Sequence, residues 1–289
     1  MLKKVGSMNE VCDAHGDDTN GSSRLSEWIR FPTRMPPSAV LHTLRYFGFT
    51  KEVIRIQDQP ISQADTATMS NNIIEHVVLF KVKDDVAPSE VDAMVNRINS
   101  LNSLDQTLHL TMAPLLSFRS TQASLNFTHI LHARYNSKHD LEEYTVHPSH
   151  VAVVKVNAPL CQDIMALDWV ANENLRGESV ILAPGSAVQV TFFKLKEGLE
   201  DRVDEILRAV MEIQEELKTK GAVQVTCGDN FSPGRAKGFS MALLVVFPGL
   251  KELEASDSHV DIHKNHKIKD YLECVMVVDF VVPSLTASN

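Results

Sequence analysis

The chain carries two copies of one sequence pattern, and this internal repeat restricts its possible folds more than any other feature. The segment Val-Thr-Phe-Phe-Lys-Leu-Lys at 190–196 closely matches Val-Val-Leu-Phe-Lys-Val-Lys at 77–83. Further along, Ser258-His259-Val260 matches Ser149-His150-Val151 in the same order. Self-similarity of this kind indicates two related domains in tandem. We therefore predict domains at residues 73–175 and 180–284, preceded by a leader at residues 1–70.

Hydrophobic spacing predicts the same order of elements in each repeat. Residues 73–83 form a β-prone segment in which His76 shares one face with apolar residues, while Glu75 lies on the more polar face. We expect the His76 face to point to the core. A helix follows from Pro88, then strands near 107–112 and 127–135, a second helix that restarts at Pro148, and a closing strand at 164–170. The fold class is therefore α+β, with two βαββαβ units of the ferredoxin-like type.

The amino-acid composition indicates which kinds of binding partner and which cellular compartment are expected. The chain has 28 Lys and Arg against 37 Asp and Glu, with a formal net charge of -9. No broad cationic surface is expected, so neither nucleic acid nor an anionic membrane is a predicted partner. The four cysteines are scattered singly, and no apolar run approaches the roughly 20 residues of a membrane helix. These features predict a soluble intracellular protein.

The leader at residues 1–70 has no alternating or repeating pattern and reads as a disordered tail. Its Arg- and Lys-containing part from Met35 to Arg55 is weakly similar to a transit peptide, so organelle import is the alternative. A peroxisomal Ser-Lys-Leu signal would stand at the end of a chain, where this sequence has Ala287-Ser288-Asn289. Cytosol and peroxisome therefore both remain expectations.

Three separated motifs carry a resemblance to a known family. Glu-His-Val-Val-Leu-Phe-Lys at 75–81, Phe-Thr-His at 127–129 and Tyr-Thr-Val-His-Pro-Ser-His at 144–150 resemble the stress-response dimeric α/β barrel (Dabb) family of plants. The likeness is strongest to tandem members, some of which are associated with peroxisomes. The resemblance implies ferredoxin-like units whose sheets pack together into a barrel, and a role in stress or defence.

The resemblance also implies site residues in the first repeat. This repeat is similar to the cannabis olivetolic acid cyclase, a single-domain member that closes a linear polyketide by aldol condensation. Position by position, Tyr144 and His150 match its catalytic pair, and His76 and His129 match its pocket histidines. Strand parity independently places His76 and His129 on inward faces, where polar groups need partners. The plainer interpretation is that these are structural histidines with satisfied hydrogen bonds.

Metal binding is weakly indicated. Some family members hold Mg²⁺ at the end of the first helix, which by position implies main-chain oxygens here. The matching residues are Asn99, Asn102, Ser103 and Asp105. No cofactor is required by the sequence. The His259, His263 and His266 series shares a helical spacing but lies among lysines, which favours a solvated helix over a zinc site.

Three functions stay open from the sequence. The first is a stress-associated protein with a small apolar or phenolic ligand in a first-repeat pocket. The second is a polyketide cyclase-like enzyme that uses Tyr144 and His150, and the third is a structural interaction protein. The second repeat has Gln189, Met241 and Leu253 at three of the four site positions, so we expect its site to be degenerate. The two repeats are expected to form an intramolecular pseudo-dimer, with a homodimer as the alternative.

Overall fold

Two antiparallel sheets, one built mainly from each repeat, form the centre of the computed structural model. The structure describes residues 73–171, 175, 177–199, 202–256 and 268–284. The leader at 1–70, and the series His259, His263 and His266, lie outside these described residues.

The first repeat follows the order predicted from its sequence. Its elements are β1 (Ile74–Val82), α4 (Pro88–Asn99), η3 (Ser100–Ser103), β2 (His109–Pro114), β3 (Ser117–Ser120), β4 (His129–Tyr135), α5 (Lys138–Val146), α6 (Pro148–Asn157), η4 (Ala158–Leu160) and β5 (Cys161–Val170). Pro88 and Pro148 each stand in a first helical turn, where the missing N–H costs no hydrogen bond. Ser137 caps α5 by accepting from the backbone N–H of Asp140 at 3.1 Å.

The second repeat copies this order after a short connecting helix. Its elements are η5 (Gly177–Val180), β6 (Ala187–Leu195), α7 (Val203–Thr219), β7 (Gln224–Asp229), η7 (Pro233–Arg235), β8 (Met241–Phe247), α8 (Leu250–Ala255), η9 (Lys269–Tyr271) and β9 (Leu272–Val281). Gly221 follows α7 with a φ of 96°. This left-handed conformation favours glycine, as expected for the residue that ends a helix.

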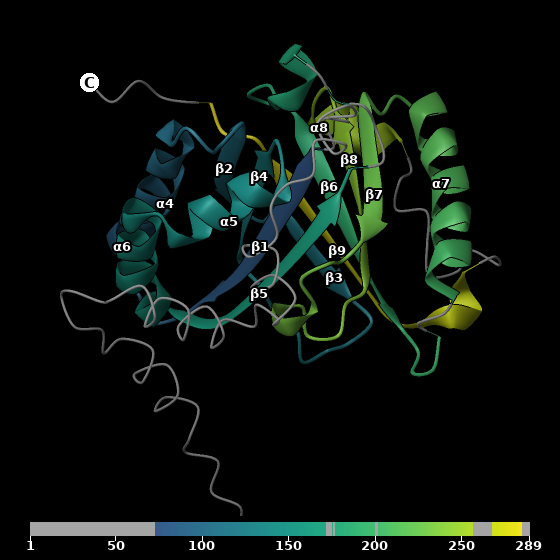
Figure 1. Cartoon of the computed structure of the whole chain (residues 1–289), viewed down its shortest axis with the longest axis horizontal. Coiled ribbons are helices and arrows are strands. Elements are labelled where there is room, and N and C mark those ends of the chain that lie inside the picture. The colour runs from purple at the N-terminus through teal and green to yellow at the C-terminus, as the bar shows by residue number, and fades with distance from the viewer. Residues whose placement is uncertain (1–72, 172–174, 176, 200–201, 257–267, 285–289) are drawn as a thin grey trace, which may run out of the picture. The chain divides into compact units, whose positions relative to one another are not determined.

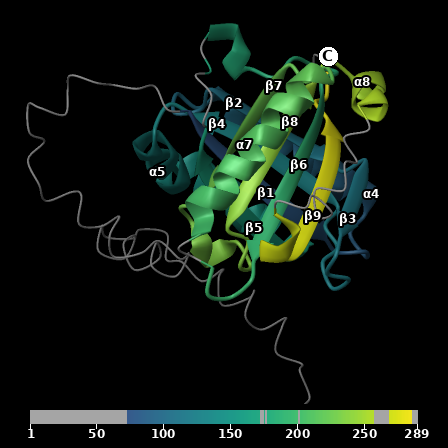
Figure 2. The same ribbon diagram turned by 90° about the vertical axis from the view of Figure 1, so that its right-hand side faces the viewer.

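The strand order confirms the ferredoxin-like α+β prediction. The first sheet runs β2-β4-β1-β5 and the second runs β3-β9-β6-β8-β7, with antiparallel pairing throughout. β3 was not predicted, because its residues read as a loop in the first repeat. It pairs instead with β9 of the second repeat, and Figure 2 shows the two side by side. One strand of the second sheet therefore comes from the first repeat.

The two sheets pack against each other, and the helices cover their outer faces. α4, α5 and α6 lie on one side of the strands and α7 on the other (Figure 1). The core between the sheets includes Val77, Leu167 and Trp169 from the first repeat and Val190 and Phe280 from the second. Separate apolar cores lie between each sheet and its own helices. The strands are therefore covered on both faces.

This double coverage adds a second buried face to β1, which the sequence did not predict. The face with His76 does point to a core, between the sheet and the helices. The opposite face, which the sequence marked as the more polar one, is also buried, because the second sheet covers it. Glu75 on that face is completely buried. Alternation shows which residues share a face, but it cannot show that a second sheet packs there.

Each repeat also covers the last strand of the other. The β2–β4 connection brings β3 onto β9, and the β7–β8 connection brings η7 beside β5. There the backbone N–H of Phe231 donates to the carbonyl of Asp168 at 3.0 Å, and the N–H of Asp168 donates to Asn230 at 3.1 Å. These reciprocal connections satisfy strand edges that would otherwise be left unpaired. Across the described residues, no helix has the length and apolar character that a membrane span requires.

Candidate functional site

Three of the four predicted site residues lie together on the helix-covered face of the first sheet. The rings of Tyr144 and His150 are 4.5 Å apart between centroids, and Tyr144 is 5.2 Å from Tyr135. Tyr135 in turn lies 6.1 Å from His76. α5 supplies Tyr144, α6 supplies His150, and adjacent strands supply the other two. We call His76, Tyr135, Tyr144, His150 and Asp168 the first-repeat site.

Asp168 anchors one end of this site. It faces His76 across the β1–β5 pairing, and the His76 Nδ1 is hydrogen-bonded to its carboxylate. Burial alone would raise the pKa of Asp168. The charge and hydrogen bond of His76, the Ser232 hydroxyl and the Arg235 guanidinium outweigh this effect and hold that pKa below its usual value. Ser232 and Arg235 belong to the second repeat, so the site is assembled from both repeats.

Burial sets the protonation states at the other end. It raises the pKa of the Tyr144 phenol, so the hydroxyl keeps its proton. It also lowers the pKa of His150 to about 4, so the imidazole is neutral near pH 7. The Nδ1–H of His150 donates to the carbonyl oxygen of Thr145 at 3.0 Å, which leaves the lone pair on Nε2. A proton donor and a neutral base therefore lie side by side.

Tyr135 gives the site a buried polar group that interacts with the Tyr144 hydroxyl without forming a hydrogen bond of normal geometry. Its side chain is completely buried, and its hydroxyl makes no hydrogen bond of normal geometry within the described residues. Burial, together with the neighbouring Tyr144 and Asp168, raises the pKa of this phenol well above its usual value. A buried hydroxyl without a partner costs on the order of 1–3 kcal/mol. Such a group is what a bound polar atom would satisfy.

His129, the fourth predicted residue, lies elsewhere. It faces Phe80 in the β1–β4 register, whereas His76 faces Ala133 four residues along β4. That offset corresponds to roughly 13 Å of strand. His129 shares a hydrogen bond of 2.9 Å with the Thr128 hydroxyl, and burial lowers its pKa. The structure therefore does not bring His129 together with the first-repeat site.

The residues matched to a magnesium site lie at the end of α4 and in the turn after it. The side-chain oxygen of Asn99 accepts from the backbone N–H of Met112 at 2.7 Å, so this oxygen already has a structural role. Asn102, Ser103 and Asp105 are exposed, and their carbonyl and carboxylate oxygens are of the type that Mg²⁺ takes. Within the described residues, no group of three or more His, Cys, Asp and Glu side chains is placed to hold a metal ion.

The second repeat lacks the same constellation. Gln189 takes the place of His76 and donates to Asp279 at 2.9 Å, and Leu253 is buried where the first repeat has Tyr144. Asp279 is also paired with Arg119 of the first repeat at 3.0 Å. The position matched to His150 is His259, which lies outside the described residues. Among the described positions, this face of the second repeat offers no phenol–imidazole pair.

Sequence reasoning missed a second polar cluster, between the sheets. Glu75 accepts from His132 at 2.6 Å, from Arg134 at 3.0 Å and from Thr226 of the second repeat at 3.0 Å. Arg134 also donates to the carbonyl oxygen of Val180, at 3.0 Å, in the connection between the repeats. The alternation of residues along β1 and β4 could have indicated this cluster, because charged residues recur on one face of both strands. That face was expected to be exposed to solvent. We call these residues the inter-sheet cluster.

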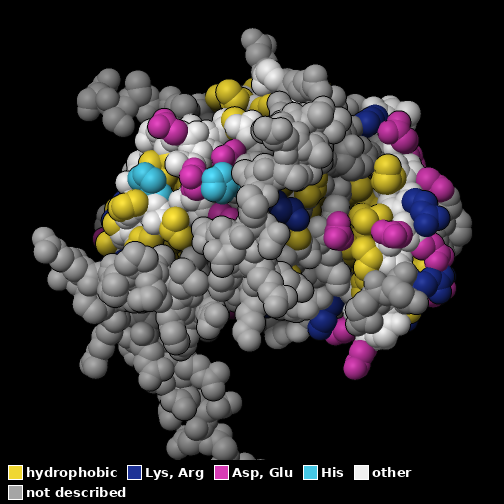
Figure 3. Space-filling view, in the orientation of Figure 1, with side chains coloured by type: hydrophobic (Ala, Val, Ile, Leu, Met, Phe, Trp, Pro, Cys, Tyr) yellow, Lys and Arg dark blue, Asp and Glu magenta, His cyan; other side chains and the backbone are white. Residues whose placement is uncertain are grey.

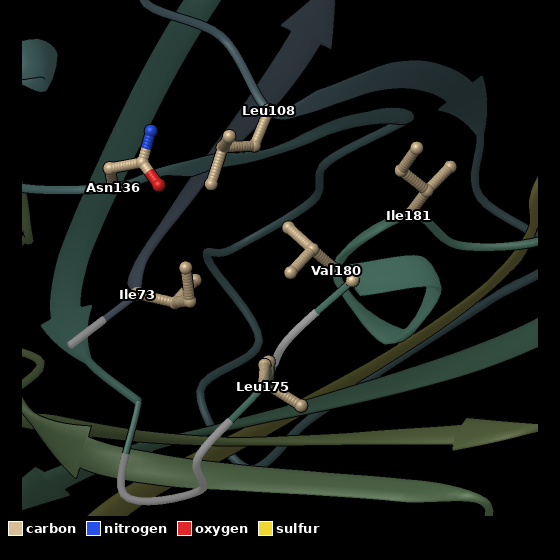
Figure 4. A pocket seen from close by; sticks show the side chains of 7 residues that line it. Ile73, Leu108, Asn136, Leu175, Val180 and Ile181 are labelled. Carbon is tan, nitrogen blue, oxygen red and sulfur yellow. The ribbon is translucent and has the colours of Figure 1, made fainter. Parts of the chain in front are cut away.

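A cavity of about 350 Å³ opens beside this cluster, where the connection between the repeats meets the ends of β1, β2 and β4 (Figure 4). Its lining is mainly apolar and comprises Ile73, Leu108, Asn136, Leu175, Gly177, Val180 and Ile181. None of the four site residues predicted from the sequence lines it. Histidine side chains are visible at the surface over the helices of the first repeat (Figure 3).

Comparison with known proteins identifies relatives along most of the chain. One stress-response A/B barrel domain-containing protein of Arabidopsis thaliana is 43% identical over 231 residues, covering 79% of this chain and 86% of the relative. A second Arabidopsis protein of the same description is 44% identical over 215 residues, covering 74% of this chain and 99% of the relative.

Solved structures add to the evidence on the fold. A crystal structure of a putative monooxygenase from Fusobacterium nucleatum matches with a TM-score of 0.53 and 14% identity, covering 74% of this chain and 93% of that one. At this identity the likeness shows the fold alone. The model of the stress responsive A/B barrel domain matches residues 74–171 and 188–282. The chain therefore belongs to the stress-responsive A/B barrel domain family and carries two of its domains in tandem.

Proposed function

We propose that the first repeat binds a small apolar or phenolic molecule at the first-repeat site, as part of a stress or defence response. The buried Tyr135 hydroxyl, which interacts with the Tyr144 hydroxyl but makes no hydrogen bond of normal geometry, is the observation that carries the proposal. A phenolic ligand would give this hydroxyl a hydrogen-bond partner and would stack against the aromatic rings. The second repeat has Leu253 and Gln189 at the corresponding positions and would serve as a scaffold.

A second function, cyclase-like chemistry, is favoured by the tautomer of His150. With Nδ1–H bound to the Thr145 carbonyl, Nε2 can take a proton from a carbon next to a carbonyl group. Tyr144 would donate a hydrogen bond to that carbonyl oxygen as negative charge develops on it. The resulting enolate carbon would attack a second carbonyl group of the same ligand molecule. The oxygen of that second carbonyl group would then take the proton back from His150. That sequence is an intramolecular aldol closure, and it balances without a cofactor.

Ligand binding can be tested with thermal shift and calorimetry against fatty acids, phenolics and polyketide lactones. We expect one of these classes to stabilise the protein, and Tyr144→Phe and His150→Ala to abolish that effect. His139→Ala is the matched control, because His139 lies on the same helix as Tyr144 but is exposed. His259→Ala should change the affinity by less than about twofold, or roughly 0.5 kcal/mol.

The outcomes separate the three candidate functions. Stabilisation by a ligand without turnover of polyketide thioesters would support a binding protein. Product formation above the buffer control, lost in both variants, would support the cyclase. No stabilisation by any compound would favour the structural role, and equal losses from His150→Ala and His259→Ala would show that the site is not confined to the first repeat.

A magnesium site at the end of α4 is a separate proposal. The helix C-terminus is the negative end of the helix dipole, and Asp105 adds a carboxylate. A rise in melting temperature with added Mg²⁺ that Asp105→Asn removes would support such a site. The same rise in both proteins would assign the effect to general ionic strength.

Localisation in peroxisome or cytosol is likewise proposed from the sequence. A fluorescent fusion of the whole chain should be compared with one that starts at Met69. Identical cytosolic signals from the two fusions would rule out targeting by the leader.

A further inference from the structure

The connection between the two repeats forms one wall of a cavity that is separate from the first-repeat site. We call this cavity, of about 350 Å³, the connection cavity. It is lined by Ile73, Leu108 and Asn136 near the ends of β1, β2 and β4, and by Leu175, Val180 and Ile181 of the connection. The side chains of Ile73, Leu108 and Val180 lie around one common space (Figure 4). A cavity of this size can hold a small molecule.

Two buried or partly buried side chains hold the connection in place at the cavity wall. Arg134 donates from Nη1 to the carbonyl oxygens of Ser179, at 3.1 Å, and Val180, at 3.0 Å. The side-chain amide of Gln224 donates to the same Ser179 oxygen at 2.8 Å. Arg134 is itself fixed by its ion pair with Glu75 in the inter-sheet cluster. The wall is therefore preformed, and a ligand would not have to order it on binding.

The cavity runs from a buried inner wall to an exposed mouth. The side chains of Ile73, Leu175 and Val180 are buried. Ile181, which also lines the cavity, is 58% exposed. Removing apolar surface from water is favourable roughly in proportion to its area. A ligand that fills the cavity and reaches its mouth would cover Ile181 as well as the inner wall.

The chemistry of the lining defines the class of ligand. Among the described residues that line the cavity, none is aromatic or charged. They offer no ring for stacking and no partner for an ionised group, which would lose its hydration on entering. The side-chain amide of Asn136 can both donate and accept a hydrogen bond. Asn136 is exposed, so this amide lies where a ligand would meet solvent.

We propose that the connection cavity is a binding site for a neutral aliphatic molecule with one terminal oxygen, such as a primary alkanol. Its hydrocarbon chain packs against Ile73, Leu108 and Val180, and its hydroxyl exchanges hydrogen bonds with Asn136. This site is separate from the first-repeat site, and its occupation does not depend on the function proposed there.

The test uses a series of primary alkanols from butanol to decanol, titrated into the full chain by calorimetry. We expect the affinity to rise about fourfold with each added methylene until the chain fills the cavity. Ile181→Gln should weaken binding of the longer alkanols by at least about fivefold. Asn136→Ala should weaken alkanol binding by about two- to tenfold and leave the binding of 1-chloroalkanes unchanged. Both replaced side chains are exposed, so the core stays intact.

Leu116→Gln is the matched control, because Leu116 is 54% exposed and does not line the cavity. This variant and Tyr144→Phe should both bind alkanols as the original chain does. Absence of binding by every alkanol would overturn the proposal, as would equal losses in Ile181→Gln and Leu116→Gln. Binding that Tyr144→Phe removes and Ile181→Gln keeps would place the alkanol in the first-repeat site instead. Tighter binding of decanoate than of decanol would reject a neutral ligand.

Discussion

Glu75→Gln should be one of the most destabilising single changes in the protein. The side chains of Glu75, His132 and Arg134 are completely buried. The carboxylate receives hydrogen bonds from both of these residues and from Thr226 of the second repeat. An amide would leave the charge of Arg134 uncompensated between the sheets. Loss of one member of a buried ion pair costs about 3–5 kcal/mol of unfolding free energy.

Urea unfolding near pH 7, followed by circular dichroism, measures this loss directly. Glu273→Gln is the control, because its ion pair with Lys194 at 2.6 Å is partly exposed and should contribute under about 1 kcal/mol. Adding Arg134→Met to Glu75→Gln should recover part of the stability, since the uncompensated charge is then removed. A loss below about 1 kcal/mol in Glu75→Gln would refute the view that the inter-sheet cluster joins the repeats.

Three further predictions follow from burial and packing. His109 is buried, and burial, with the charges of His132 and Arg134, lowers its pKa to about 3. The unfolded chain then binds more protons below about pH 6.5. His109 should therefore cost about 2 kcal/mol of unfolding free energy between pH 6.5 and pH 5, and His109→Leu should show a flatter pH profile. Gly228→Ala should destabilise the protein by about 1–3 kcal/mol, because an added Cβ would lie 2.9 Å from Trp169 Cδ1 and from the backbone oxygen of Val170, and an unchanged melting temperature would contradict this packing. Light scattering should report a monomer near 32.2 kDa, because the sheets already cover each other within one chain, and a dimer that pairs first repeats would contradict that arrangement.

Part of the first-repeat site was predictable from the sequence. His76, Tyr144 and His150 were named from motifs, and the structure places them close together. Tyr135 and Asp168 were visible as strand residues, but nothing in the local pattern linked them to the histidines. Their role depends on register, since Asp168 faces His76 only because β1 and β5 pair antiparallel at that position. Register is set by the whole sheet, so no local segment contains the information.

The sequence by itself determined the tandem repeat, the order of strands and helices, and the helix restart at Pro148. These features depend on local propensities and on periodicity along a single segment. Only the tertiary structure decided that Glu75 is buried, that β3 crosses to the second sheet, and that the β7–β8 connection is hydrogen-bonded to Asp168. Each of these depends on contacts between residues far apart in the chain. The free energy of such contacts comes from packing two sheets together. The alternation of polar and apolar residues along one strand does not specify which sheet packs on it.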